Sequence, residues 1–145
     1  MREQLDRILV ALDGSEPSLR ALDTALDVAA ATGASLQLVS VVDVHEAELY
    51  DGLYLSREQV DALKQRVMQQ ILEPALARCR ERKVEAKAKE LVGRPLKVLL
   101  QEVDAEAPSL VVMGRTGRGA FERMLEGSVS RGMVTRAHVP VMVVP

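Results

Sequence analysis

Aromatic residues are nearly absent from this chain, which holds one phenylalanine, two tyrosines and no tryptophan among 145 residues. Proteins that bind single-stranded nucleic acid stack the bases on aromatic rings, and so few rings supply no such surface. The net charge is −2, so the chain as a whole also lacks the basic field that attracts a nucleic-acid backbone. We therefore expect no nucleic-acid partner.

Cysteine and long apolar runs are scarce as well. The single Cys79 excludes a disulfide framework and any zinc site built from several thiolates, and it is typical of a reducing compartment. No apolar run approaches the roughly 18 residues of a membrane-spanning helix. The opening residues MREQLDRILVALD also lack the pattern of a signal peptide. The sequence predicts a soluble, cytoplasmic protein with no membrane partner.

Few residues in the chain are suited to catalysis. His45 and His138 are the only histidines, and no Gly-x-Ser-x-Gly turn presents a nucleophilic serine. Related folds that transfer adenylate carry a Ser-Gly-Gly-x-Asp-Ser loop or a His-Ile-Gly-His tetrad, and neither occurs here. We expect Cys79 to be a packing thiol. We predict no catalytic residue and no metal-binding carboxylate cluster, so an enzyme is the less favoured interpretation.

Short apolar runs alternate with longer amphipathic stretches along the whole chain. We expect five of the apolar runs to be strands, at residues 7–12, 35–42, 84–92, 110–113 and 139–144. Helical stretches between successive strands are typical of right-handed crossovers in a parallel sheet. We predict one domain over residues 1–145. Its fold is α/β and doubly wound, a five-stranded parallel sheet of order 3-2-1-4-5 with helices on both faces.

Several residues mark the ends of these elements. Ser15 is a good N-cap for the first helix, and Gly33 is a good stop for it. Ser56-x-x-Gln59 reads as a capping box, and Pro74 predicts a kink in the long helix that follows. The lysines of the third strand and Pro140 in the last strand both favour positions at a sheet edge.

Two features follow strands that the predicted order makes neighbours. Asp13 closes the first strand, and a glycine-rich loop beginning at Gly114 closes the fourth. In open α/β sheets, ligands bind at the carboxyl ends of the strands, at the point where the strand order reverses. We therefore expect Asp13 and the glycine loop to face each other across one crevice.

The glycine loop has the composition of a phosphate site. It reads Gly114-x-x-Gly117, then nine residues, then Gly127-Ser128 at a predicted helix start. Glycines let a backbone approach a phosphate closely, and a helix N-terminus directs N–H groups at an anion. Five arginines and two acids between Gly114 and Arg136 make this segment locally basic, at 5 − 2 = +3. The alternative is that these glycines only shape tight turns.

This spacing resembles the motif of the ATP-binding branch of the universal stress protein family, which is Gly-x-x-Gly, nine residues, then Gly-Ser or Gly-Thr. The resemblance covers essentially the whole chain, through RILVALDGSEPSLRAL, LQLVSVVD, LVGRP and VPVMVV. Two positions depart from the family pattern. Ala11 stands where some members have proline, and Ser109 stands where many have aspartate; neither lies in the phosphate motif.

The resemblance implies a site for ATP. Asp13 would lie near the ribose and adenine, and Val41 would meet the adenine. Met113 and Gly114 would flank the sugar, and Mg²⁺ would be held mainly by phosphate oxygens and water. Gly117 and Gly127 to Ser130 would hold the triphosphate. The full predicted set is Ala11, Leu12, Asp13, Val41, Met113, Gly114, Arg115, Gly117, Arg118, Gly127, Ser128, Val129 and Ser130.

For some of these residues a structural role is the alternative. Asp13 could simply be a turn acid that caps the first helix, and Val41 and Met113 could be plain core residues. A receiver domain of a phosphorelay would also have five parallel strands, but it needs an acidic pair after the first strand and an aspartate after the third. Here Asp13 stands alone, and Leu91-Val92-Gly93 ends the third strand.

The function that the resemblance implies is that of a nucleotide-dependent sensor or regulator in a stress response, with slow or no hydrolysis. The last strand, residues 138–144, is apolar and expected at an edge, and the resemblance implies that it pairs with a second copy to form a homodimer. The alternative is a dimeric interaction module of the same fold with a vestigial nucleotide site.

Overall fold

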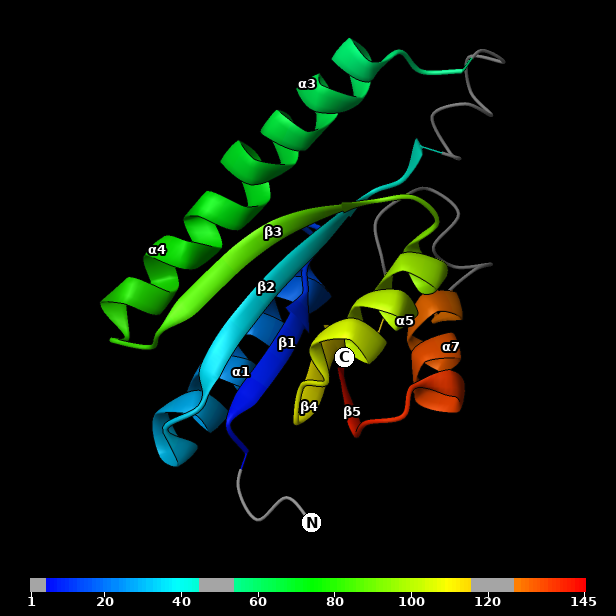
Figure 1. The fold of residues 1–145 in the computed structure, drawn as a ribbon. Coiled ribbons are helices and arrows are strands. Elements are labelled where there is room, and N and C mark those ends of the chain that lie inside the picture. Colours follow the sequence, from blue (N-terminus) through cyan, green and yellow to red (C-terminus); the bar gives the residue numbers. More distant parts are fainter. Residues whose placement is uncertain (1–4, 45–53, 116–126) are drawn as a thin grey trace.

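The fold is a five-stranded, all-parallel sheet with helices on both faces (Figure 1). The computed structural model describes residues 5–44, 54–115 and 127–145. The strand order is β3-β2-β1-β4-β5, which confirms the predicted doubly wound topology. The order reverses beside β1, so β1 and β4 flank the point where a ligand of such a fold is expected.

The described elements follow the predicted alternation of strand and helix. The strands are β1 (Arg7–Ala11), β2 (Ser35–Val42), β3 (Ala86–Val92), β4 (Leu110–Gly114) and β5 (Val141–Val144). The helices are α1 (Glu16–Thr32), α3 (Arg57–Val67), α4 (Glu73–Glu81), α5 (Pro95–Glu106) and α7 (Ser128–Arg136), with a π-helical turn η1 (Met68–Leu72) between α3 and α4. Of the helices described, none is both long and apolar enough to cross a bilayer.

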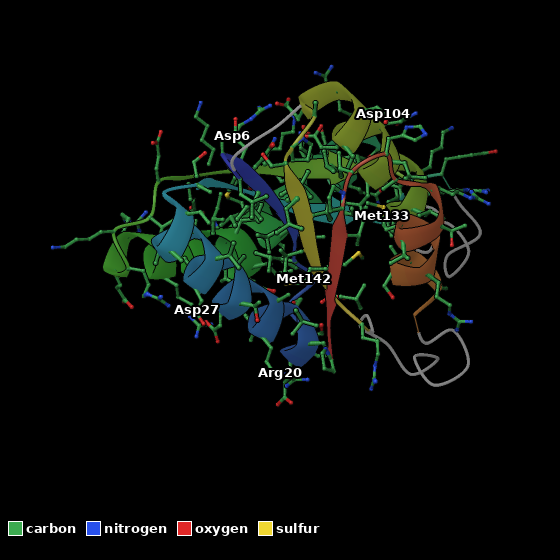
Figure 2. All side chains as sticks on the ribbon, turned by 90° about the horizontal axis from the view of Figure 1, so that it is seen from below. Asp6, Arg20, Asp27, Asp104, Met133 and Met142 are labelled. Atoms are coloured by element: carbon green, nitrogen blue, oxygen red, sulfur yellow. The ribbon has the colours of Figure 1, made fainter. Side chains whose placement is uncertain are left out.

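Alternation along the strands builds one core on each face of the sheet. Ile8 and Val10 of β1 point toward α1 and α4, whereas Leu9 points toward α5 and α7. Figure 2 shows the same division farther along the sheet, with Met142 of β5 on the α1 side and Met133 of α7 on the other. Because both faces are covered, the central strands are apolar on both sides.

The predicted helix caps are confirmed. Ser15 caps α1 by accepting the Ser18 N–H, and Gly33 ends the helix in the left-handed region at φ +77°. Ser56 and Gln59 form the reciprocal capping box of α3. After α3, the π-helical turn η1 precedes Pro74, and in this turn the Glu73 N–H donates to the Met68 carbonyl. Proline lacks an N–H, and the wider turn just before it accommodates this residue within the helical run; the kink itself stays a prediction.

Both predicted edge strands, β3 and β5, lie at edges of the sheet. Lys89 of β3 also forms an ion pair that the sequence pattern did not predict. Glu102 of α5 has a side chain only 8% exposed, and its carboxylate accepts hydrogen bonds from Lys89 Nζ at 2.6 Å and Gln37 Nε2 at 3.1 Å. The hydrogen bond to Glu102 raises the pKa of Lys89 above the ordinary lysine value of 10.5. These contacts join α5 to β2 and β3.

Replacing Lys89 with methionine should leave the buried Glu102 carboxylate short of a partner and lower the free energy of unfolding by about 1–3 kcal/mol at neutral pH. A raised lysine pKa stabilises the fold below pH 10.5, and that contribution is lost as the pH rises through the folded-state value. The difference in the free energy of unfolding between wild type and Lys89→Met should therefore become smaller at alkaline pH. Urea unfolding of both proteins across that range measures it.

Arg82→Met is the matched control, because Arg82 bonds to Asp27 at 2.9 Å with both side chains well exposed. An exposed pair contributes less than about 1 kcal/mol. Equal losses in the free energy of unfolding of the two variants would show that burial of Glu102 does not strengthen its contact with Lys89.

Candidate functional site

The carboxyl ends of β1 and β4 meet where the sequence predicts a crevice. Ala11 stands opposite Met113 in the parallel register. One residue further, Gly114 lies against the first turn of α1, so close that a Cβ at this position would be 2.8 Å from the Pro17 carbonyl carbon and 2.9 Å from the Ser18 nitrogen. Gly114 is therefore required for packing α1 on β4, a role separate from any contact with a ligand.

Asp13 lies in the turn between β1 and α1. Its Oδ1 accepts the Ser15 N–H at 2.9 Å, and its own N–H donates to Ser18 Oγ at 3.4 Å. This is the turn-capping role that the sequence left open for this acid. The turn follows the last residue of β1, so it holds the Asp13 carboxylate at the carboxyl end of this strand.

The apolar residues predicted for the site separate by face. Ala11, Val41, Met113 and Val129 all belong to the core on the α5 and α7 side, near the carboxyl edge of the sheet. Leu12 packs into the opposite core, beneath α1, and is only 3% exposed. Its side chain is therefore not brought together with the others; its backbone N–H bonds to the Val39 carbonyl at 2.8 Å.

The N-terminus of α7 supplies donors suited to an anion. Gly127 occupies the N-cap position at φ +76°, in the left-handed region. The first N–H groups of an α-helix have no acceptor within the helix, and here they belong to residues from Ser128 to Ser130. The side chain of Ser128 is exposed at the same end. Together with the positive end of the helix dipole, this arrangement favours phosphate or another anion.

Ser130 has a contact that its place in the motif did not predict. The residue is only 5% exposed, and its hydroxyl lies 2.9 Å from the Arg115 carbonyl oxygen and 3.1 Å from that of Gly127. The Arg115 N–H donates to the Val144 carbonyl at 2.7 Å. The peptide groups of Arg115 thus join β4, β5 and the first turn of α7.

A cavity of about 570 Å³ opens beside this junction. Three predicted site residues, Arg115, Gly127 and Ser130, contribute to its lining. The rest of the lining comes from α7 and β5, through Arg131, Val134, Thr135 and Val143. Asp13, Val41 and Met113 are not part of its lining, and neither are Ser128 and Val129, so the cavity adjoins only part of the predicted set.

The remaining predictions about reactive residues have different outcomes. Gly117 and Arg118 of the predicted set, and His45, lie outside the described residues. Cys79 is 1% exposed, and burial raises the pKa of its thiol, which confirms a packing role. His138 is exposed, and its Nδ1 lies 3.6 Å from Oδ1 of Asp104. Within ranges 5–44, 54–115 and 127–145, no three His, Cys, Asp or Glu side chains gather as metal ligands.

Comparison with known sequences agrees with the resemblance that the sequence motif indicates. The sequence model of the universal stress protein family matches residues 4–145. A universal stress protein of Methanocaldococcus jannaschii is 31% identical over 140 residues, an alignment that covers 95% of this chain and 81% of the relative.

Solved structures share the fold. A universal stress protein in complex with cAMP superposes with a TM-score of 0.67 at 27% identity, covering 97% of this chain and 96% of that one. The universal stress protein of Archaeoglobus fulgidus in complex with dAMP gives a TM-score of 0.69 at 22% identity, covering 97% and 98%.

Proposed function

The chain belongs to the universal stress protein family, and we propose that it binds ATP and acts as a nucleotide-dependent regulator in a stress response. The observation that carries the proposal is that the turn after β1 and the N-terminus of α7 lie at one edge of the sheet. Asp13 is held at the end of β1, and Gly127 with the N-terminus of α7 lies beside the end of β4. The relatives crystallised with cAMP and dAMP support an adenine nucleotide as the ligand class.

The phosphate end is the better supported half of the site. The N–H groups of the first α7 turn are directed away from the helix, and Gly127 leaves room beside them because it has no side chain. Arg115 and Arg131 line the adjacent cavity and add positive charge. Donors and charge of this kind suit a triphosphate, and Mg²⁺ would be held by its oxygens and by water.

The sugar and base end rests on Asp13, Val41, Met113 and Gly114. A carboxylate accepts hydrogen bonds from ribose hydroxyls, and the half-buried Val41 provides apolar surface on the face of the sheet where Met113, only 6% exposed, also packs. Gly117 and Arg118 remain part of the proposal on sequence grounds alone. Asp13, the one carboxylate of this set, is assigned to the ribose and not to the phosphates, so we propose that occupancy, rather than rapid hydrolysis, carries the signal.

Gly127→Val tests the phosphate end. A Cβ at Gly127 would point at Arg131 Nε and Ser130 Oγ, both 3.4 Å away, so a branched side chain fills the space proposed for phosphate. ATP affinity measured by calorimetry should fall by about 100-fold or more. Unchanged affinity would contradict a phosphate site at this helix.

Gly33→Val is the control for backbone strain. Gly33 has nearly the same left-handed conformation, at φ +77°, with no atom within 4 Å of a built Cβ. The substitution imposes a similar strain at the far end of α1, and it should lower stability without changing ATP affinity. A matching loss of affinity in this variant would attribute the effect at Gly127 to destabilisation.

Asp13→Asn tests the charge of the acid without removing its turn. An asparagine oxygen can still accept the Ser15 N–H, whereas Asp13→Ala would lose that bond as well. We expect Asp13→Asn to weaken ATP binding by about 1–3 kcal/mol and to leave inorganic triphosphate unaffected, because Asp13 is assigned to the ribose. An equal loss for both ligands would assign the acid to the phosphate end instead.

We also propose that the chain forms a homodimer through β5. This strand pairs with β4 on one side, lies at the edge of the sheet and consists of four half-buried apolar residues, Val141–Val144. An apolar edge strand is a template for pairing with another chain. Antiparallel pairing of two β5 strands across a two-fold axis would cover both edges in one interface.

Light scattering at micromolar concentration tests the dimer. The expected mass is twice the 15.9 kDa of one chain, and a mass equal to one chain would contradict the proposal. Val143→Lys should favour the monomer, with circular dichroism to confirm that the fold is intact. Val92→Lys is the control, because Val92 ends the opposite edge strand and is 39% exposed. It should leave the mass unchanged.

A further inference from the structure

Two serines in the first turn of α7 have opposite environments. Ser128 is exposed at the first helical position, while Ser130, two residues later, is 5% exposed with its hydroxyl against two backbone carbonyls. One of these carbonyls belongs to Gly127, within the same turn, and the other to Arg115, at the exit of β4. The sequence motif alone gives the two serines the same role.

We propose that Ser130 is a positioning residue: its hydroxyl fixes the Arg115 peptide to the first turn of α7, and residue 130 meets the ligand only through its backbone N–H. The inference rests on the proposed nucleotide site and deepens it. It assigns the hydroxyl contact with phosphate to Ser128 and the spacing between the two sides of the site to Ser130.

The chemistry of the hydroxyl supports this division. A serine hydroxyl has a single hydrogen to donate, and that of Ser130 lies at 2.9 Å from Arg115 O and at 3.1 Å from Gly127 O. A phosphate that took this hydrogen would remove the bond by which Ser130 joins α7 to the Arg115 carbonyl at the exit of β4. The exposed hydroxyl of Ser128 can turn toward a ligand without that cost.

The surrounding contacts show why one hydroxyl can set the spacing. On its far side α7 lies tightly against α5, because a Cβ at Gly132 would be 2.5 Å from a methyl carbon of Leu96. At the β4 exit, the Arg115 N–H is held by Val144 of β5 at 2.7 Å. Ser130 joins these two anchored segments, so removing its hydroxyl should loosen the junction even when no ligand is bound.

The test begins with the nucleotide-free protein. Amide hydrogen exchange by NMR should show the Arg115 and Arg131 amides, which donate to Val144 and Gly127, exchanging roughly 5- to 10-fold faster in Ser130→Ala than in wild type. Ser128→Ala should exchange at the wild-type rate, and Ser130→Thr, which keeps a hydroxyl, should restore it. If Ser130→Ala does not fold, Ser130→Cys, a weak donor of similar size, takes its place.

Titration of the same variants with ATP and with inorganic triphosphate completes the test. Ser130→Ala should lower the affinity for both ligands by the same factor, and Ser130→Thr should bind them with nearly wild-type affinity. Ser128→Ala should lower both affinities without any change in the amide exchange rates. Wild-type exchange rates in Ser130→Ala, or rates in Ser130→Thr as fast as in Ser130→Ala, would overturn the proposal. If wild type bound neither ligand, the proposed function would fail, yet the exchange comparison would still decide the role of Ser130.

Discussion

Parallel pairing of β1 with β4 is the constraint on which the rest of the site depends. It sets Ala11 opposite Met113, so both strands end at the same edge of the sheet. Gly114 makes the approach possible, because any side chain there would collide with the first turn of α1. The same turn holds Asp13 through the Ser15 N–H. Residues at this edge therefore contribute both to the stability of the fold and to the geometry of the candidate site, and a substitution here affects both.

The topology could be predicted from the sequence because local patterns and a few chirality rules determine it. Apolar runs between amphipathic stretches allow little besides a doubly wound sheet, and caps such as Ser15 and Gly33 act within one turn of the chain. Boundaries were less predictable. The third strand begins at Ala86 rather than at residue 84, and the last at Val141 rather than at residue 139, because pairing with a neighbouring strand decides where each ladder begins.

Contacts between segments far apart in the chain are what sequence patterns could not supply. Helical spacing places Glu102 among apolar neighbours, but only the packing of α5 on β3 shows that Lys89 neutralises it. The same holds for Ser130, whose partner Arg115 is separated from it by 15 positions and a glycine-rich segment. Leu12 follows β1 directly beside Asp13, yet alternation turns its side chain into the opposite core. The motif predicted which segments meet, and the structure shows which side chains join them.

Nucleotide binding is the central claim, and equilibrium dialysis of the purified protein against labelled ATP tests it most directly. The proposal predicts saturable binding at one site per chain; it rests on the geometry at Gly127, on the family membership and on the relative solved in complex with cAMP. Unlabelled ATP should displace the label. A label that distributes equally across the membrane at every protein concentration would contradict the account and leave the chain as an interaction module with a vestigial site.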